Sequence, residues 1–212
     1  MSACDSLFSS ELAALAQLDP ALQPVMDAAG PLPARAGRCD FEGLASTVVS
    51  QLVSRQSAEA IFSRLVRETG GLTPEAYLAV GRGQGPRLGL TAAKADTLVR
   101  AAEAILAGKL DLSTLAHLET ERALEALRSI KGIGPWTAEV HLLFNAGHSD
   151  IFPAGDLALR LSVASGLGLA ERPNPTALKD RALAWAPYRS VAARLFWAYY
   201  GRVVRPGVAL LP

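Results

Sequence analysis

The sequence predicts an all-α protein, and three observations favour that fold class. Half of the 212 residues are hydrophobic, with many alanines and leucines, which favours helices and supplies a full core. Runs rich in β-branched and aromatic residues are scarce. Apolar residues recur at helical spacing, as at Leu44, Val48, Ile61 and Leu65. The length suits one domain, or two lobes that share a core.

Proline and glycine bound the helices expected in the first half of the chain. These helices span 9–18, 21–28, 41–68 and 92–108. Pro20 ends the first because proline cannot continue a helix, and Gly108 ends the last. The long pattern has an expected break near 52–54. The glycine-rich segment 81–91 (GRGQGPRLGLT) is expected to be loop and turn.

The second half predicts a further set of helices. They span 119–129, 137–145, 156–165 and 188–200. Gly147–Gly155 is expected to be a connector, and Pro187 precedes the last helix. The whole chain is therefore expected to form roughly ten helices joined by short turns, with no sheet.

Charge and cysteine content limit the possible functions. The net charge is +1, so any DNA binding must come from a local surface. Cys4 and Cys39 are the only cysteines, too few for a four-cysteine zinc or iron–sulfur site. The start of the chain lacks a signal-peptide pattern, and no apolar run approaches membrane-spanning length. A cytoplasmic protein without a membrane partner is expected.

In the segment 130–140 (IKGIGPWTAEV), two glycines leave the backbone uncovered by side chains just before an expected helix. Gly132 and Gly134 tolerate positive φ and let another backbone approach. Ile133 would plug into the core, and Pro135 suits a first helical turn. The backbone N–H groups of the turn and of the helix N-terminus would then form a phosphate-binding site. The alternative is a plain corner between two helices, with the glycines serving sterics alone.

The residues Leu127-x-x-Ile130-x-Gly-Ile-Gly-Pro-Trp-Thr-Ala, followed by Asp156 after a connector, resemble the helix-hairpin-helix DNA glycosylase superfamily. Within it, the chain is most similar to the alkylation-repair branch, the 3-methyladenine DNA glycosylase II type. The resemblance extends from about Phe41 to about Gly201. It implies two helical lobes with a central cleft. The 40 residues before Phe41 are too few for the N-terminal sheet domain of some relatives.

The resemblance also implies how the chain is divided. The whole of 1–212 is expected to form a single glycosylase unit. Its central lobe, with the hairpin, would span 41–148, and the second lobe would combine 1–40 with 149–212. The implied partner is double-stranded DNA with alkylated bases, bound by a monomer, associated with the nucleoid if the protein is bacterial.

Asp156 stands where a helix is expected to begin, so it could be only an N-cap. A helix N-terminus also favours an anion, which the implied chemistry needs. Breaking an N-glycosidic bond builds positive charge on the sugar, and a fixed carboxylate stabilises it and orients water. By resemblance, Asp156 is the catalytic residue. Trp136 stands where strand-nicking relatives carry lysine, and Lys131 is expected to face phosphate, so a monofunctional enzyme is expected.

Trp136 and Trp197 are the candidate walls of a base pocket, by resemblance. An electron-rich ring stacked on a cationic alkylated base gains cation–π energy. Either ring could instead be a core residue, and Trp185 is expected to be structural. Val140 occupies a position where some relatives place a pocket tyrosine, so the pocket is expected to be more open.

Leu52, in Gln51-Leu52-Val53-Ser54, resembles the leucine of this branch that inserts into the duplex. The alternative is a core leucine on a helix, although its polar neighbours favour an exposed turn. The DNA contacts implied by the resemblance are Gln51, Leu52, Lys131, Gly132, Ile133, Gly134 and Thr137.

The resemblance implies no required cofactor. Hairpins of the family often bind a monovalent cation, Na⁺ or K⁺, through backbone carbonyls. Here these would belong to Arg128, Ile130 and Ile133. The histidines lack ligand spacing with carboxylates or cysteines, so no catalytic metal is expected.

Three functions are compatible with the sequence. The first is a monofunctional glycosylase that excises bases such as 3-methyladenine and 7-methylguanine and leaves an abasic site. The second is a hairpin module that only binds DNA. The third, excision of adenine or oxidised guanine, is disfavoured by the absence of an iron–sulfur cluster and of a hairpin lysine nucleophile. The pairing of the hairpin with Asp156 favours the first.

Overall fold

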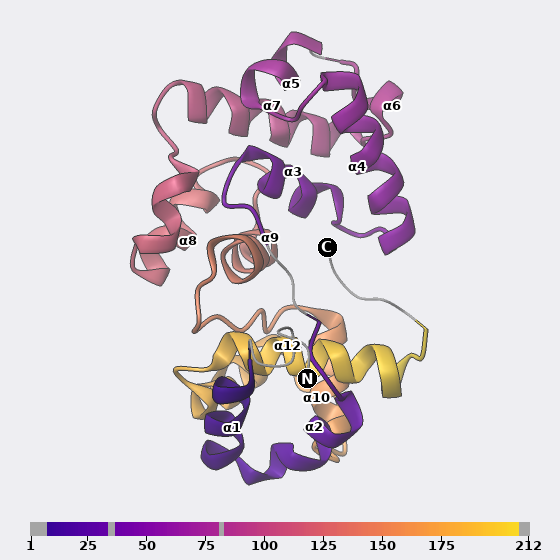
Figure 1. Ribbon diagram of the computed structural model, residues 1–212, viewed down its shortest axis with the longest axis vertical. Helices are drawn as coiled ribbons and strands as arrows, with labels where there is room; N and C mark the ends of the chain where they lie inside the picture. The colour runs from indigo at the N-terminus through magenta and orange to yellow at the C-terminus, as the bar shows by residue number, and fades with distance from the viewer. Residues whose placement is uncertain (1–7, 34–36, 81–82, 208–212) are drawn as a thin grey trace. The chain divides into compact units, whose positions relative to one another are not determined.

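The computed structural model describes residues 8–33, 37–80 and 83–207, and Figure 1 shows helices as their regular elements. The described part of the chain holds no strand, which confirms the all-α class. It divides into two compact units: the terminal unit, formed by 8–33 with 148–207, and the central unit, 37–147. None of the described helices is both long and apolar enough to cross a membrane.

The terminal unit is built around its last long helix. Its elements are α1 (Ser9–Leu18), η2 (Pro20–Leu22), α2 (Gln23–Ala29), α10 (Leu157–Gly166), α11 (Pro175–Ala182), η5 (Leu183–Trp185), α12 (Arg189–Tyr199) and η6 (Tyr200–Val204). α12 packs against α2 and α10. Trp185 is fully buried, with its ring centroid 5.2 Å from that of Phe152 and 5.3 Å from that of Phe196. Its Nε1 donates to Asp19 Oδ2 at 2.8 Å, which confirms a structural role.

The central unit is built around α7. Its elements are α3 (Phe41–Val49), α4 (Arg55–Thr69), α5 (Pro74–Val80), α6 (Gly85–Leu88), α7 (Ala92–Leu106), η3 (Leu112–His117), α8 (Thr120–Arg128), α9 (Pro135–His141) and η4 (Leu142–Ala146). α7 packs against α3 and α5, and α3 also packs against α9. Leu44, Val48 and Leu65 are fully buried, as their helical spacing predicts, whereas Ile61 is half-buried.

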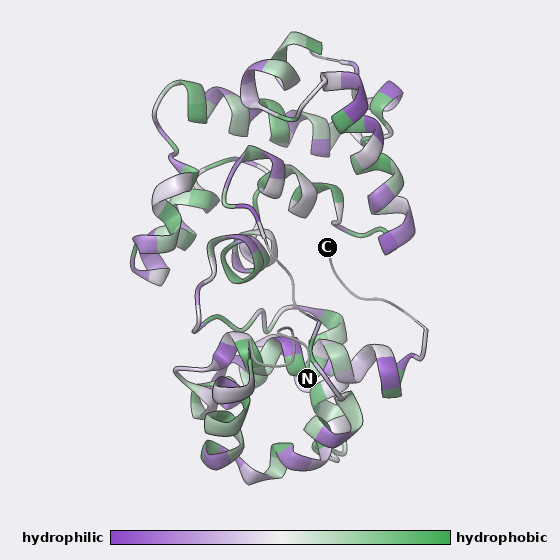
Figure 2. Cartoon of the chain, in the orientation of Figure 1, coloured by the Kyte–Doolittle hydropathy of each residue, from purple (hydrophilic) through white to green (hydrophobic). Residues whose placement is uncertain are grey.

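Short polar side chains define where many of these helices begin. The N-cap side chains that accept a backbone N–H include those of Asp19, Asp40, Ser54, Thr91, Asp111, Asp156 and Asn174. Each satisfies a donor that the first helical turn leaves without an intrahelical acceptor. Figure 2 shows polar and apolar residues interspersed along the helices, as expected of helices that bury one face.

The structure differs from the sequence prediction at several places, since α5 and η3 were also not predicted. Residues 81–82 of the expected loop lie outside the described residues, and 83–91 is not only loop and turn, because the Gly85-Pro86 pair starts α6 and Gly89, at φ 83°, ends it. α11 was not predicted, although Asn174-Pro175 is a capped start of the expected kind. The helix expected over 137–145 begins earlier, at Pro135, and continues from His141 as the π-helix η4.

His141, at the end of α9, is fully buried. Its Nδ1 lies 3.3 Å from Asn145 Nδ2, whose amide also donates to Thr47 Oγ1 at 3.2 Å. Within the described residues its Nε2 has no hydrogen-bond partner. Burial lowers the pKa of His141 to about 4, and the charge of Asp40 opposes this only in part. The ring is therefore neutral in the folded protein near neutral pH.

This burial predicts that stability falls in mild acid. The unfolded chain protonates His141 near its ordinary pKa of 6.5, whereas the folded chain resists protonation until about pH 4. The contribution of the neutral His141 to the free energy of unfolding is therefore complete above pH 6.5. It is lost as the pH falls toward 4, and the loss is about 3 kcal/mol. Urea unfolding between pH 7.5 and 4.5 measures this loss. His141→Gln should flatten the slope in that window, and an unchanged slope would contradict the assignment.

Candidate functional site

The hairpin joins α8 to α9 in the central unit. Two backbone hydrogen bonds shape the turn, from Ile130 N to Leu127 O at 3.2 Å and from Ile133 N to Ile130 O at 3.0 Å. Ile133 is buried, as its place between the glycines predicts. Gly134 is the N-cap of α9, and Pro135 occupies its first position. The turn is therefore anchored from inside while its glycines and Lys131 remain exposed.

The two glycines of the hairpin are needed for different reasons. Gly132 has φ 107°, and a Cβ there would collide with Thr97 Oγ1 of α7. Gly134 has an ordinary φ of −84°, and apart from its two neighbours in the chain no described residue has an atom within 4 Å of the place where its Cβ would be. The fold explains Gly132 but not Gly134. The open space at Gly134 leaves room for an external group to approach the backbone.

Leu52 lies in the turn between α3 and α4. The break expected near 52–54 is present, since α3 ends at Val49 and α4 begins at Arg55. The Leu52 side chain is fully exposed, and its backbone has φ 56°. A core role for Leu52 is therefore wrong, and the expected exposed turn is confirmed. Left-handed backbone at a leucine costs about 1–2 kcal/mol, so the turn is strained at its most apolar residue.

Hydrogen bonds tie the Leu52 turn to α7 and α9. Lys94 Nζ donates to the carbonyls of Val49 at 2.8 Å and Gln51 at 2.7 Å. Gln51 Nε2 donates to Thr137 Oγ1 at 2.6 Å, and Thr137 is buried. Gln51 and Thr137 are both expected to contact DNA, and in the structure their side chains contact one another, so their contact with DNA stays a prediction. The sequence did not predict the two hydrogen bonds of Lys94, because Lys94 is distant in sequence from the Leu52 turn.

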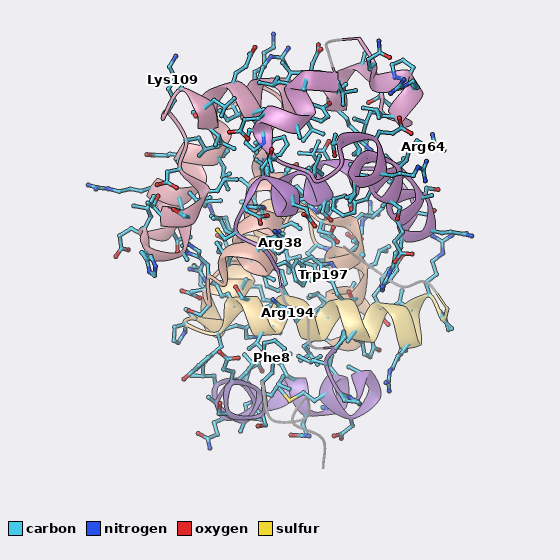
Figure 3. All side chains as sticks on the ribbon, turned by 45° about the horizontal axis from the view of Figure 1, so that its top comes forward. Phe8, Arg38, Arg64, Lys109, Arg194 and Trp197 are labelled. Carbon is cyan, nitrogen blue, oxygen red and sulfur yellow. The ribbon has the colours of Figure 1, made fainter. Side chains whose placement is uncertain are left out.

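Asp156 caps α10 in the terminal unit, and its carboxylate has two described donors. Oδ1 accepts Leu159 N at 2.9 Å and Trp197 Nε1 at 3.2 Å. Asp156 itself is partly exposed. Trp197, labelled in Figure 3, lies on α12 and is buried except for a small part of its surface. The two residues were proposed separately for catalysis and the pocket, and the structure brings them together.

The connector before Asp156 is fixed to the start of α12. Arg189 pairs with Asp150 through Nε at 2.7 Å and Nη2 at 2.9 Å. Ser190 Oγ donates to His148 O at 2.7 Å and accepts Ile151 N at 2.9 Å. Sequence reasoning missed these contacts, which cross about forty residues and carry no local signal. They hold the segment that leads into Asp156 against the helix that carries Trp197.

The remaining pocket candidates lie on α9. Trp136 is partly exposed. Val140 is fully buried, so its side chain packs in the core, and its place beside a base pocket stays a prediction. In the described ranges, no group of three histidine, cysteine or acidic side chains could hold a metal ion.

No family model matches the chain. DNA-3-methyladenine glycosylase 1 of Schizosaccharomyces pombe is 33% identical over 175 residues, which cover 78% of this chain and 77% of the relative. The chain belongs to the DNA-3-methyladenine glycosylase family.

Solved structures of DNA-3-methyladenine glycosylases share the fold. The DNA-3-methyladenine glycosidase of Bacillus halodurans is 29% identical with a TM-score of 0.81, over 92% of this chain and 91% of that one. The 3-methyladenine DNA glycosylase of Schizosaccharomyces pombe, in complex with abasic DNA, is 28% identical with a TM-score of 0.80, over 91% and 96%. These comparisons support the helix-hairpin-helix assignment made from the hairpin and Asp156.

The different surroundings of the hairpin glycines predict different stabilities. Gly132→Ala should lower the free energy of unfolding by about 2–3 kcal/mol, because it combines a steric collision with unfavourable backbone. Gly134→Ala should change it by less than about 0.5 kcal/mol. Chemical denaturation of both variants and the wild type measures the difference. Equal destabilisation by the two substitutions would contradict the geometry of the turn.

Proposed function

We propose that the protein is a monofunctional DNA glycosylase that flips alkylated bases out of duplex DNA and excises them. The class of substrate is 3-methyladenine, 7-methylguanine and similar bases, and the product is an abasic site. The observation that carries the proposal is the carboxylate of Asp156, held by two donors at a helix N-terminus in a chain of this family. The protein would act as a monomer in the cytoplasm, on nucleoid DNA in a bacterium.

Asp156 would act on the sugar of the flipped nucleotide. As the N-glycosidic bond breaks, the bonding electrons leave with the base and positive charge develops at the anomeric carbon. A nearby carboxylate stabilises this charge and orients or deprotonates the attacking water. Leu159 N and Trp197 Nε1 hold Oδ1, which supports a fixed carboxylate that needs no reorganisation during the reaction.

Alkylation itself supplies part of the driving force. A base methylated at a ring nitrogen carries positive charge, so it is a better leaving group and a better partner for an aromatic face. Trp136 is partly exposed and is the candidate stacking surface. The indole of Trp197 gives its polar edge to Asp156, so its part in the pocket would include orienting that carboxylate.

The hairpin would hold the DNA backbone while Leu52 fills the gap left by the flipped base. The exposed glycines Gly132 and Gly134 and the exposed Lys131 suit a phosphate. An exposed leucine on a short turn suits insertion between base steps. Ile133, being buried, would support the turn rather than contact DNA through its side chain.

The absence of a suitable lysine supports a hydrolytic, monofunctional reaction. The chain has lysines only at 94, 109, 131 and 179. Lys94 is committed to two carbonyls, and Lys131 precedes the hairpin glycines. Trp136 occupies the place at which a strand-nicking relative would carry a nucleophilic lysine. We therefore assign no Schiff-base chemistry to the hairpin.

A monovalent cation at the hairpin belongs to the same proposal. The backbone carbonyls of Arg128, Ile130 and Ile133 would hold Na⁺ or K⁺. Arg128 ends α8, where carbonyls lack intrahelical partners. The Ile130 carbonyl accepts Ile133 N at 3.0 Å and keeps a second lone pair, so the donor set fits a hard cation. Such an ion would add positive charge beside a bound phosphate. No organic cofactor is required for hydrolysis.

Asp156→Asn tests the catalytic assignment with little change in structure. Asparagine is also a good N-cap and can accept both hydrogen bonds, but it carries no charge. Excision of 3-methyladenine and 7-methylguanine from methylated duplex DNA should fall by at least about 100-fold, while melting temperature and DNA binding are retained. Base release is measured directly, and strand breakage is measured with and without alkali.

The matched control is Asp180→Asn, an exposed carboxylate on α11 of the same unit. It should excise as the wild type does. Normal excision by Asp156→Asn would show that the carboxylate only caps α10. A wild type that binds DNA but releases no alkylated base would favour the binding-module alternative. Strand breakage without alkali would contradict the monofunctional assignment.

Gly134→Ala tests whether the hairpin binds a DNA phosphate, without changing the stability of the protein. Its Cβ would project into space that the protein leaves open, so it should obstruct only an external group. We expect the variant to fold as the wild type does and to bind duplex DNA about tenfold more weakly. Fluorescence anisotropy with a duplex carrying a stable abasic analogue measures the affinity. Unchanged affinity would mean that DNA backbone does not approach this glycine.

A further inference from the structure

Lys94 occupies an unexpected place for a cation. It lies in the first turn of α7, three residues after the N-cap Thr91. The positive end of a helix dipole disfavours a lysine there. Its ammonium instead reaches the carbonyls of Val49 and Gln51, at 2.8 and 2.7 Å. Val49 is the last residue of α3, where the dipole favours a cation, and Gln51 directly precedes Leu52.

The Leu52 turn has a second attachment, from Gln51 Nε2 to Thr137 Oγ1 at 2.6 Å. Thr137 lies on α9, just after the hairpin. On the other side of Leu52, Ser54 caps α4 by accepting Ser57 N at 3.2 Å. Leu52 is therefore flanked by fixed residues, although its own side chain meets only solvent. These contacts fix the direction in which an exposed leucine projects.

The helix that carries Lys94 also supports the hairpin. Residues spaced by three lie near one another on a helix surface. Thr97 fills the space beside Gly132, and Arg100 Nη1 donates to Lys131 O at 3.3 Å. The helix α7, labelled in Figure 1, therefore contacts both the Leu52 turn and the hairpin turn. This arrangement fixes the spacing between the two turns.

We propose that Lys94 is a positioning residue that holds the Leu52 turn ready for insertion into DNA. The inference rests on the proposed function of the hairpin and Leu52, and it extends that function to a residue remote from the DNA contacts. Ordering a free turn on binding would cost conformational entropy for each residue. The two charge-assisted hydrogen bonds from Lys94 order the Leu52 turn when the protein folds, so this entropy is not lost again when DNA binds. Partial burial lowers the pKa of Lys94, in accord with an ammonium withdrawn from solvent.

Lys94→Met tests the proposal because it keeps the length of the side chain and removes its donors. Lys109→Met, at an exposed lysine beyond the other end of α7 (labelled in Figure 3), is the matched control. Single-turnover excision from paired duplex DNA should fall about tenfold in Lys94→Met and not in the control. The loss should be smaller when the lesion lies in an unpaired bulge, where less unstacking is needed.

A double-mutant cycle with Leu52→Ala identifies the route of the effect. If Lys94 acts through Leu52, then Lys94→Met should cause no further loss in the Leu52→Ala background. If the fold-losses of excision rate in the two single variants multiply in the double variant, the proposal is overturned, and Lys94 would then contact DNA itself. If Lys94→Met fails to fold, Thr137→Val removes the other attachment of the turn. It should show the same dependence on Leu52, and an effect independent of Leu52 would overturn the proposal.

A readout without chemistry separates this inference from the proposed function. 2-Aminopurine placed beside a stable abasic analogue brightens when Leu52 unstacks it, and this is measured in the Asp156→Asn background. Brightening should be lost in Leu52→Ala and reduced severalfold in Lys94→Met. If the wild type excises nothing but this pattern holds, the glycosylase proposal fails and the positioning role stands. Brightening that is absent, or unchanged in Lys94→Met, overturns the positioning role.

Discussion

The contact of α7 with two irregular turns is the constraint on which the central unit depends. An exposed turn has few apolar contacts and loses backbone entropy when it is ordered. Here Lys94 satisfies carbonyls of one turn, and Thr97 and Arg100 contact the other. Because one rigid helix supports both, neither can shift without affecting the helix. The fold thus converts two flexible loops into a surface of defined geometry.

In the terminal unit, a long helix likewise positions the carboxylate of Asp156. Asp156 follows a connector with no regular structure, yet Arg189 and Ser190 at the start of α12 bind that connector through Asp150, His148 and Ile151. The same helix then supplies the Trp197 indole that donates to Asp156. In both units, a long helix packed into the core positions a residue that local structure alone would leave mobile.

How much could be predicted from the sequence depended on whether the signal was local. The N-cap at Asp156, the buried Ile133 and the break before Ser54 follow from neighbouring residues, and all are present. The bonds from Lys94 and Gln51 join segments separated by more than forty residues, so no spacing rule indicates them. The burial of Val140 was likewise missed, because the direction of a side chain on α9 depends on what packs against the helix.

Leu52 shows why the exposed turn calls for a functional explanation. A solvent-exposed leucine gains no burial energy, and its left-handed backbone adds strain, so the folded chain is less stable than a glycine or asparagine at this position would make it. Yet the surrounding residues hold this unfavourable conformation with three hydrogen bonds from distant segments. Stabilising contacts placed around a destabilising residue make sense if its side chain is buried elsewhere during function. Stacked bases of DNA offer an apolar environment in which Leu52 would recover that energy.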